Sequence, residues 1–527
     1  MDADESREGS LWHRTGPSIA TDGALPARCD VLVVGAGLTG LTTARMLARA
    51  GGRPVVVEAT RVGALTTGGT TGKVSLLQGS VYGALSRRAG PGVLRAYAAA
   101  NADAQAWLSR ETADDPRIME RKDAYTYATT PEGARTLERE AFALASTGLA
   151  VETLGDPGFS SVDLPFPVPA ALRLRDQAQV HPMRLLRHLA DATRAEGGTV
   201  VGGCRLLGAS VTAGGVRVAT TRGPVVADAV VLATGTPVLD RGLHFARITP
   251  SRELVGAYAV EGMIPDGMYL SVDPVSRSLR GATDETGDEV LLVGGASFVP
   301  GRGTDTTARL VDLDAWTRAS FGPAERVAWW GAQDYTMAGR LPSAGIMPRS
   351  RGRILAATGY GKWGMTNAVA AAMTIVGELT GERPGWLAPL RARRPGIRSV
   401  STAAAANAEV AGRLASGWAR ALVRSRPTRS PRVAREGARL VAESRVDGET
   451  CRVSGVCTHL GGVLEWNVAE QTWDCPLHGS RFRPDGRVVE GPAVADLAPA
   501  PTGSGGVRVR RLDDSGVEVL GDQHDPA

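Results

Sequence analysis

Two cysteines and two histidines near the C-terminal end of the sequence form its clearest candidate metal site. They occur as Cys457-x-His459 and, fifteen residues later, as Cys475-x-x-His478. Two thiolates and two imidazoles can hold a two-iron cluster unequally, with the cysteines on one iron and the histidines on the other. Zinc also accepts this set of four, but zinc fingers pair Cys with Cys and His with His along the chain. The alternating order therefore predicts a [2Fe–2S] cluster, with zinc as the less favoured alternative.

A second chemical signature lies near the other end, where Gly35, Gly37 and Gly40 form the pattern G-x-G-x-x-G. A β-branched run precedes the glycines, apolar residues at helical spacing follow them, and a second β-branched run ends at Glu58. Such glycines let the backbone approach a pyrophosphate at a helix N-terminus, and an acidic residue about twenty positions on accepts hydrogen bonds from a ribose. The order of strand, glycines, helix, strand and acid predicts a dinucleotide-binding unit.

Three further stretches favour FAD over a nicotinamide nucleotide. Residues 66–75 (TTGGTTGKVS) combine small hydroxyl side chains with glycine, and residues 228–237 (DAVVLATGTP) are typical of a strand that ends in Ala-Thr-Gly. Residues 353–372 predict a strand, a glycine loop and a helix that begins near Gly364 and would aim its amides at the negative charge of a reduced flavin. We expect non-covalent FAD, since no Cys or His lies in these motifs. The expected cofactor-binding residues are Gly35, Gly37, Gly40, Glu58, Thr70, Thr71, Lys73, Leu206, Thr234, Gly235, Gly359, Gly364, Met365 and Thr366.

Lysine is scarce, which makes the few lysines worth attention. Only Lys73, Lys122 and Lys362 occur among 60 basic residues. Lys73 and Lys362 both fall inside the flavin motifs, so we expect at least one of them to act on the cofactor or in catalysis.

These motifs resemble the D-amino-acid oxidase and glycine oxidase family of FAD-dependent oxidoreductases, over about residues 10–395. The resemblance implies a glutathione-reductase-like, Rossmann-type α/β FAD domain interleaved with an α+β substrate domain. Amino-acid-oxidising members commonly carry an arginine after W-x-G-L that clamps a carboxylate. The comparable stretch here, residues 329–345 (WWGAQDYTMAGRLPSAG), offers Gln333 as the third candidate catalytic residue. A neutral amide cannot replace a bidentate guanidinium, so a free α-amino acid is a less favoured substrate than an amine or an amino-acid derivative.

The cysteine and histidine pairs, with their LGG, WDCPLHGSRF and DG surroundings, resemble the Rieske domain over about residues 432–521. Rieske proteins of cytochrome bc complexes carry disulfide-bonded cysteines at the positions of Gly462 and Leu477, and a tyrosine at that of Phe482. Ser480 keeps a hydroxyl that can bond a cluster sulfur. Fewer hydrogen bonds to the sulfurs predict a potential in the lower or middle part of the roughly −150 to +300 mV Rieske range.

Length and composition predict a multidomain protein that binds no nucleic acid. The 527 residues exceed a single core, and the net charge of +5 is small for this length. We expect an N-terminal segment (1–29), the oxidoreductase (30–395), a helix and linker (396–432) and the small all-β Rieske domain (433–521). No apolar run approaches the ~20 residues of a membrane span. The acidic, polar N-terminus is unlike a secretory signal, which predicts a cytoplasmic protein.

Joining a flavin to an iron–sulfur cluster couples two-electron chemistry to single-electron transfer. We expect a flavin dehydrogenase or oxidase that oxidises a C–N bond of a small molecule and passes electrons through the cluster to a ferredoxin, cytochrome or quinone. The alternative is a reductase in which the cluster and FAD relay electrons from a ferredoxin or NAD(P)H to a partner or substrate. A purely electron-transferring module or redox sensor is a third possibility. A Rieske oxygenase is disfavoured, because no close histidine pair remains for a mononuclear iron.

Overall fold

The computed structural model describes residues 8–155, 162–239, 241–303, 305–391, 397–423 and 431–500. Parts of the expected segments lie outside these ranges. They include residues 1–7 of the N-terminal segment, residues 392–396 and 424–430 around and within the helix and linker, and residues 501–521 of the Rieske domain. No helix within the described ranges is long and apolar enough to cross a membrane.

The first of two large sheets has a parallel centre, as the dinucleotide-binding motif predicts. Its order is β16-β17-β10-β1-β2-β7, with β9 and β8 added at the edge of β10. The apolar runs around the glycine motif pair side by side, since Leu32 faces Val55 in register. The strands are β1 (Arg28–Val34), β2 (Val55–Val57), β7 (Thr199–Val201), β8 (Leu206–Thr212), β9 (Gly215–Thr220), β10 (Gly223–Leu232), β16 (Ser343–Ile346) and β17 (Ile354–Thr358).

Three helices pack with this sheet in one hydrophobic core. They are α2 (Leu38–Arg49), α6 (Pro182–Ala195) and α8 (Gly364–Thr380). The short helix α1 (Leu11–Thr15) joins the same core through Leu11 and Trp12. The described part of the N-terminal segment is therefore built into the oxidoreductase and does not stand apart from it.

The second large sheet is mixed and has the order β15-β11-β14-β13-β12-β4-β6-β3, with β5 beside β6. All its neighbours are antiparallel except β4 and β12. Its strands are β3 (Lys73–Val74), β4 (Met119–Ala128), β5 (Glu152–Leu154), β6 (Ala170–Val180), β11 (Ile248–Val260), β12 (Met268–Ser271), β13 (Arg277–Thr283), β14 (Glu289–Phe298) and β15 (Ala324–Met337). The helices of this part are α3 (Val81–Ser86), α4 (Pro91–Glu111), α5 (Pro131–Leu144), α7 (Thr306–Phe321) and α9 (Leu387–Arg391).

The chain passes between the two sheets several times. It makes β1 and β2 in the first sheet, β3 to β6 in the second, β7 to β10 in the first, β11 to β15 in the second, and β16 and β17 in the first. This order confirms the expected α/β FAD-type domain interleaved with an α+β domain.

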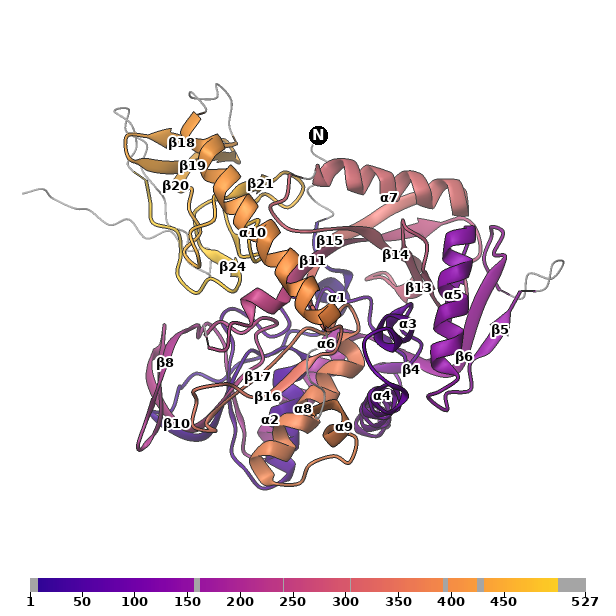
Figure 1. Ribbon diagram of the computed structural model, residues 1–527, viewed down its shortest axis with the longest axis horizontal. Coiled ribbons are helices and arrows are strands. Elements are labelled where there is room, and N and C mark those ends of the chain that lie inside the picture. The colour runs from indigo at the N-terminus through magenta and orange to yellow at the C-terminus, as the bar shows by residue number, and fades with distance from the viewer. Residues whose placement is uncertain are drawn as a thin grey trace, which may run out of the picture.

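A small all-β domain follows, as expected, and Figure 1 shows it beside the larger part. It has a three-stranded and a four-stranded antiparallel sheet around its own apolar core, which includes Trp473 and Phe482. The strands are β18 (Arg432–Glu436), β19 (Arg439–Val446), β20 (Glu449–Ser454), β21 (Glu465–Asn467), β22 (Thr472–Asp474), β23 (Arg481–Phe482) and β24 (Val488–Glu490).

A long helix, α10 (Ile397–Val423), runs between the two parts in Figure 1. The Asn407 amide donates to the Ala246 carbonyl oxygen in the larger part at 2.7 Å, and the Trp418 indole donates to the Gly461 carbonyl oxygen in the small domain at 3.1 Å. Val410 and Leu414 pack against the core of the small domain. The helix expected before the linker is therefore a packed connection that contacts both parts.

Candidate functional site

A cavity of about 510 Å³ lies between the two large sheets, and we call it the cofactor cavity. Eleven of the fourteen expected cofactor residues line it: Gly35, Gly37, Glu58, Thr70, Thr71, Lys73, Leu206, Thr234, Gly235, Gly364 and Met365. The other three, Gly40, Gly359 and Thr366, pack against its wall. A side chain at Gly359 would collide with Met337, and the Thr366 hydroxyl accepts a hydrogen bond from Gln78 at 3.2 Å.

Two of the three glycines of the motif, Gly35 and Gly40, have no room for a side chain. Gly35 has a φ of +106°, and a Cβ there would lie 2.5 Å from the Ala233 carbonyl oxygen. A Cβ at Gly40 would lie 1.8 Å from the Gly35 carbonyl oxygen, because helix α2 starts against the turn. Gly37 caps α2, so the first free amides of that helix open at the cavity wall. This cradle fits a pyrophosphate.

Glu58 stands at the end of β2, where the motif requires a ribose acceptor. Its carboxylate accepts hydrogen bonds from the amides of Ala36 at 2.9 Å and Thr60 at 3.0 Å. Burial raises the pKa of this carboxyl, and the two amide contacts oppose the shift. Cys204 and Arg205, which the sequence reasoning did not select, line the same end of the cavity.

The loop at residues 65–72 forms another wall and is fixed from outside the cavity. The Trp12 indole donates to the Thr70 carbonyl oxygen at 2.6 Å, and the Trp330 indole donates to that of Gly69 at 2.8 Å. Trp330, one of the aromatic residues near Gln333, is thus a support for the loop.

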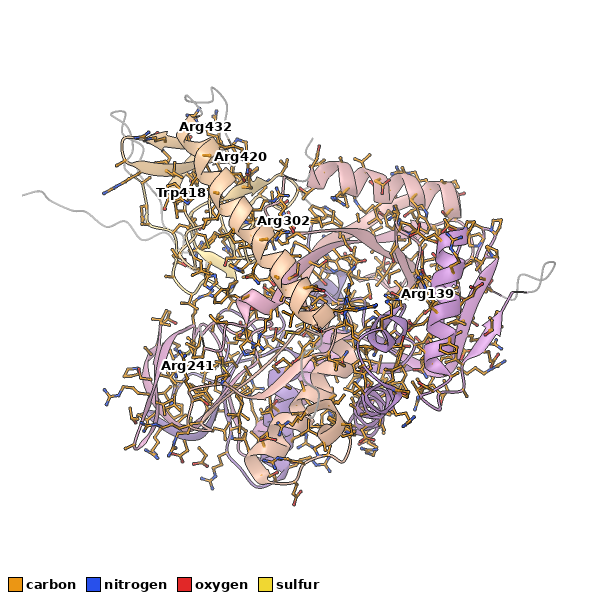
Figure 2. The ribbon with its side chains drawn as sticks, viewed as in Figure 1. Arg139, Arg241, Arg302, Trp418, Arg420 and Arg432 are labelled. Carbon is orange, nitrogen blue, oxygen red and sulfur yellow. The ribbon has the colours of Figure 1, made fainter. Side chains whose placement is uncertain are left out.

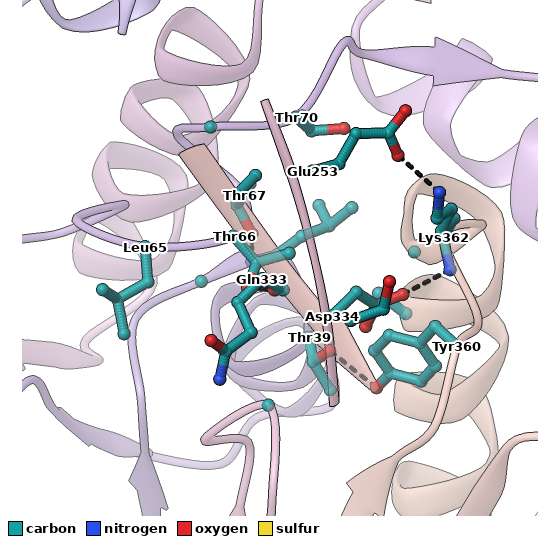
Figure 3. Close-up of a pocket in the computed structure, with 18 of the residues that line it drawn as sticks. Thr39, Leu65, Thr66, Thr67, Thr70, Glu253, Gln333, Asp334, Tyr360 and Lys362 are labelled. Atoms are coloured by element: carbon teal, nitrogen blue, oxygen red, sulfur yellow. Dashed lines mark hydrogen bonds and ion pairs between the residues drawn. The ribbon is translucent and has the colours of Figure 1, made fainter. Parts of the chain in front are cut away.

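Lys362 lies on the opposite side of the cofactor cavity, next to two carboxylates. Its ammonium is 2.7 Å from Glu253 and donates to the Ser297 hydroxyl at 2.6 Å. Its backbone amide donates to Asp334, and Figure 3 shows both contacts. Burial raises the pKa of Asp334. The sequence reasoning found Lys362 but missed Glu253, whose surroundings in the chain carry no motif.

Lys73 is buried where the cavity meets β12 and β13. Its ammonium donates to the Tyr269 carbonyl oxygen at 2.5 Å and to the Ser278 hydroxyl at 2.7 Å. Burial, followed by repulsion from Arg280, lowers the pKa of Lys73 to about 7. An amine that is partly neutral at neutral pH can accept a proton.

Gln333 lies between the cofactor cavity and the small domain. Its backbone carbonyl accepts from Thr66 at 2.6 Å, while its side-chain amide donates to the Tyr335 hydroxyl at 2.8 Å and to the Gly479 carbonyl oxygen at 2.9 Å. In Figure 3 this amide points away from Glu253 and Lys362. The structure therefore gives Gln333 a bridging position, with its amide donors already used within the protein.

The two candidate cluster loops have the same backbone geometry. In the first, the Gly461 amide donates to the Cys457 carbonyl oxygen at 3.1 Å, and in the second the Gly479 amide donates to that of Cys475 at 3.1 Å. Both glycines have left-handed φ values, +73° and +79°. The loops follow β20 and β22, so the tips of two strands present the four predicted ligands together.

The four side chains meet as two pairs. The thiols of Cys457 and Cys475 contact each other, while the rings of His459 and His478 lie 5.2 Å apart between centroids. The Cys475 thiol, together with the amides of His459 and Leu460 and the Ser480 hydroxyl, lowers the pKa of Cys457 to about 7. Burial lowers the pKa of His478 to about 4, and its buried Nδ1 has no hydrogen-bond partner within the described ranges. The Cys457 thiol, together with burial, raises the pKa of Cys475 well above its ordinary value, so Cys457 is the member of the pair that ionises first. A neutral imidazole and a thiolate are the forms that bind metal.

This arrangement fits two irons better than one zinc ion. The two thiols form one pair and the two imidazoles another, which suits two irons with two protein ligands each, whereas a structural zinc needs four ligands around one ion. A Cβ at Gly462 would lie 2.9 Å from the Cys475 sulfur and 2.8 Å from Leu477, so the two loops close tightly around the site.

The larger part packs directly against the cluster loops. The Phe245 ring contacts the rings of His459 and His478, at centroid distances of 6.0 Å and 5.3 Å. Arg302, labelled in Figure 2, donates to the Pro476 carbonyl oxygen at 3.1 Å and pairs with Glu409 of α10 at 2.6 Å.

The small domain also contributes to the wall of the cofactor cavity. Residues Val489, Glu490, Gly491, Ala493 and Val494 line it. The same segment is bonded to the cluster region, since the Ala493 amide donates to the Ser480 hydroxyl at 3.0 Å. A single loop thus joins the cluster ligand region to the cofactor cavity.

A second cavity, of about 240 Å³, lies where the small domain meets the larger part, and we call it the interface cavity. It shares Glu490, Val489, Gln333 and Leu65 with the wall of the cofactor cavity. Its other charged or titratable lining residues are Glu8, His13, Arg61, Arg252, Glu470 and Arg481.

Family models match most of the chain. The model described as FAD dependent oxidoreductase matches residues 30–377, and the Rieske [2Fe-2S] domain model matches residues 422–501. A Bacillus subtilis (strain 168) protein described as a Rieske 2Fe-2S iron-sulfur protein, YhfW, is 31% identical over 484 residues, which cover 89% of this chain and 92% of that protein. The cytochrome b6-f complex iron-sulfur subunit of Nostoc punctiforme is 44% identical over 63 residues, 12% of this chain and 35% of that subunit.

Solved structures share the fold of the larger part. Glycine oxidase from Geobacillus kaustophilus superposes with a TM-score of 0.57 at 19% identity, over 68% of this chain and 96% of that one. L-amino acid deaminase from Proteus myxofaciens superposes with a TM-score of 0.56 at 15% identity, over 70% of this chain and 94% of that one.

Proposed function

This chain belongs to the FAD dependent oxidoreductase family and carries a Rieske [2Fe-2S] domain, and from this premise we propose that it oxidises a C–N bond and sends the electrons out through the cluster. FAD and a Rieske [2Fe–2S] cluster are its cofactors, and it is an oxidoreductase. The substrate we propose is an amine or an amino-acid derivative. The fold shared with a glycine oxidase and an L-amino acid deaminase supports this class.

The residues of the cofactor cavity have distinct proposed roles toward FAD. The cradle at Gly35 and Gly37 would hold the pyrophosphate, and Glu58 would hold the ribose. Bound FAD supplies acceptance of a hydride from carbon. Met365 and the helix start at Gly364 would face the flavin with unpaired amides.

Three charged side chains of the cavity would act on the substrate. Lys73 would take the proton that a substrate ammonium loses before its C–N bond is oxidised. Glu253 would accept a hydrogen bond from the substrate nitrogen, and Lys362 would hold Glu253 in place. Gln333 would act as a positioning residue, because its amide joins the cavity wall to Gly479 beside the ligand His478.

The position of the loop at residues 489–494 supports the proposal that electrons leave through the cluster. It lines the cofactor cavity and is hydrogen-bonded to Ser480, whose hydroxyl contacts the Cys457 thiol. A cluster held this close to the cavity can receive electrons one at a time and deliver them to an external ferredoxin, cytochrome or quinone. The reverse direction, from such a carrier to the flavin, is the alternative.

His478→Ala tests the proposal. Anaerobic bleaching of the flavin by amines and amino-acid derivatives should persist, because that step needs only the flavin and its pocket. Turnover with ferricenium as a one-electron acceptor should collapse to the residual rate at which the flavin is oxidised directly, because the exit route through the cluster is missing. His188→Ala, on helix α6, serves as the matched control for removing an imidazole.

Two outcomes contradict this direction of flow. If turnover falls only in proportion to lost folded protein, the cluster is structural. If no substrate bleaches the unmodified protein while a reduced ferredoxin reduces its FAD, the cluster is the entry port.

A further inference from the structure

Five charged side chains are buried together where the small domain meets the larger part. Arg252 of β11 makes a bidentate contact with Glu470, one bond of which is 2.6 Å. Arg481 of β23 lies 3.1 Å from Asp474 and 3.2 Å from Glu470. The fifth member is Glu490 of β24, whose nearest ion-pair distances, to Arg252 and Arg481, are 3.6 Å and 3.9 Å.

The charges of this group balance without an ionised Glu490. Two arginines offset two close carboxylates, Glu470 and Asp474, so a third carboxylate would leave an uncompensated buried negative charge. Arg252 and Arg481 hold the pKa of Glu470 at about 2 despite its burial. Burial raises the pKa of Glu490 to about 7, with Glu470 and Asp474 adding to the shift and the arginines opposing it.

Glu490 stands between two spaces. It lines both the cofactor cavity and the interface cavity. The interface cavity extends to Glu8, Arg61 and Leu65, which are exposed at the surface. A group at this position can exchange a proton with either side.

The proposed reaction requires such a group. A hydride consists of two electrons and one proton, and a [2Fe–2S] cluster accepts electrons only. For each substrate oxidised, two electrons would leave through the cluster one at a time and continue to the external acceptor. The proton of that hydride has to leave the cofactor cavity by another path.

We propose that Glu490 is the proton relay between the cofactor cavity and the interface cavity, a role that rests on the proposed function. Its carboxylic acid releases a proton into the interface cavity, and the carboxylate formed takes up the proton left in the cofactor cavity. Electrons and protons therefore leave the cavity separately, through adjacent parts of one domain.

The groups that face Glu490 come from every element around it. Across the interface cavity lie Glu8, the exposed Arg61, and His13, whose pKa burial lowers to about 4. The remaining charged or titratable neighbours are Arg252, Tyr335, Glu470, Asp474 and Arg481.

Glu490→Gln tests the relay, since glutamine keeps the shape of the protonated acid but cannot exchange its proton. The holoprotein is photoreduced anaerobically with EDTA and mixed with ferricenium in weak buffer containing a pH indicator. We expect flavin oxidation and proton release to slow together by about 10²-fold at pH 7. Added formate, a small acid that can enter the cavity, should restore both rates. Rates within a factor of about two of the unmodified protein, or a slow rate that formate leaves unchanged, would overturn the proposal.

Glu470→Gln is the matched control, because it removes a carboxylate that contacts the same two arginines and lines the interface cavity. This change removes the bidentate partner of Arg252 and leaves that buried guanidinium, among the described residues, with only the 3.6 Å contact to Glu490, so the holoprotein should melt at a lower temperature. Any slowing in Glu470→Gln should be insensitive to formate.

Infrared spectroscopy gives a readout that does not depend on turnover. The unmodified holoprotein should show a protonated-carboxyl band that is lost as the pH rises through about 7 and that is absent from Glu490→Gln. Absence of this band from the unmodified protein would refute the relay. If no substrate bleached the oxidised protein but mixing it with a reduced ferredoxin reduced its flavin with uptake of protons, the proposed direction of electron flow would fail while the relay role would stand.

Discussion

At the scale of single residues, the cluster site is built twice from one pattern. Each loop starts with a cysteine whose carbonyl accepts from the glycine four positions later, and each glycine is left-handed, Gly461 in one loop and Gly479 in the other. The cysteine amides also make equivalent hydrogen bonds in the two loops. The Cys457 amide donates to the Gly462 carbonyl oxygen at 2.9 Å, and the Cys475 amide donates to the Ser480 carbonyl oxygen at 2.8 Å. Ligand presentation is therefore a local property of each loop.

Lys73 provides a pH-dependent prediction at the same scale. Because its pKa is lowered to about 7, the amine is neutral above that pH. Anaerobic flavin reduction by an amine should accelerate as the pH rises through about 7. In Lys73→Met the reaction should be slower by about 10²-fold and should lose this inflection. Lys122→Met is the control, since Lys122 does not line the cofactor cavity and pairs with Glu120 and Asp266. An unchanged pH profile in Lys73→Met would exclude Lys73 as the base.

The same shift affects stability with a definite sign. The unfolded chain keeps Lys73 protonated up to about its ordinary pKa of 10.5, while the folded protein releases that proton near 7. The folded state therefore gains stability as the pH rises from about 7 to 10.5. Lys73→Met should remove this part of the pH dependence of the free energy of unfolding.

At the scale of elements, the turn after β14 sets the position of the cluster loop after β22. Gly301 has a φ of +66°, and a Cβ there would lie 2.6 Å from the Pro476 nitrogen and 2.7 Å from the Asp474 carbonyl oxygen. The backbone at Gly301 and the backbone at residues 474–476 thus lie so close together that only glycine fits. Arg302 stabilises this contact by donating to the Pro476 carbonyl oxygen.

Gly301→Ala should move the turn after β14 away from the cluster loop after β22. Overpacking of this kind costs about 1–3 kcal/mol, and we expect slower reduction of the cluster by the flavin with unchanged FAD content. Gly303→Ala is a close control, because Gly303 also has a left-handed φ, +60°, but open space around its Cβ position. Both variants carry the backbone strain, so equal effects on cluster reduction would show that the Pro476 contact is unimportant.

At the scale of the whole molecule, the interleaved chain places the cofactor cavity between the two large sheets. The small domain forms part of the wall of this cavity. Buried ion pairs such as Arg252 with Glu470 and hydrogen bonds such as Thr306 to Asn467, at 2.8 Å, hold the small domain in place. The cluster ligands themselves, however, belong to loops with their own core.

Gly37→Val tests whether the small domain folds and binds its cluster independently of the flavin site. A branched side chain at Gly37 would occupy the pyrophosphate position and press on Thr67, whose hydroxyl lies 3.2 Å from the Cβ position. The purified variant should lose FAD absorbance and keep its two irons and the cluster spectrum. Gly214→Val, in the open β8–β9 turn, is the control for adding a valine. Loss of both cofactors together would show that the small domain depends on an occupied flavin site.

The sequence by itself determined the features that rest on local spacing. The glycine motif with Glu58 predicted a dinucleotide-binding unit, and the two Cys–His pairs predicted a [2Fe–2S] cluster site, because the spacing of a few neighbouring residues defines both motifs. The helix expected within residues 396–432 was also predictable from the sequence, and α10 (Ile397–Val423) lies in that segment.

Only the tertiary structure decided how the two centres meet. Gln333, selected as a substrate-facing residue, has its amide committed to Gly479 more than a hundred residues away. The charge balance that keeps Glu490 protonated needs side chains from β11, β22, β23, β24 and a turn, and no sequence spacing records their convergence. Burial and the pairing of charges arise from packing between distant segments. Residues whose chemistry depends on burial therefore become visible only in the folded molecule.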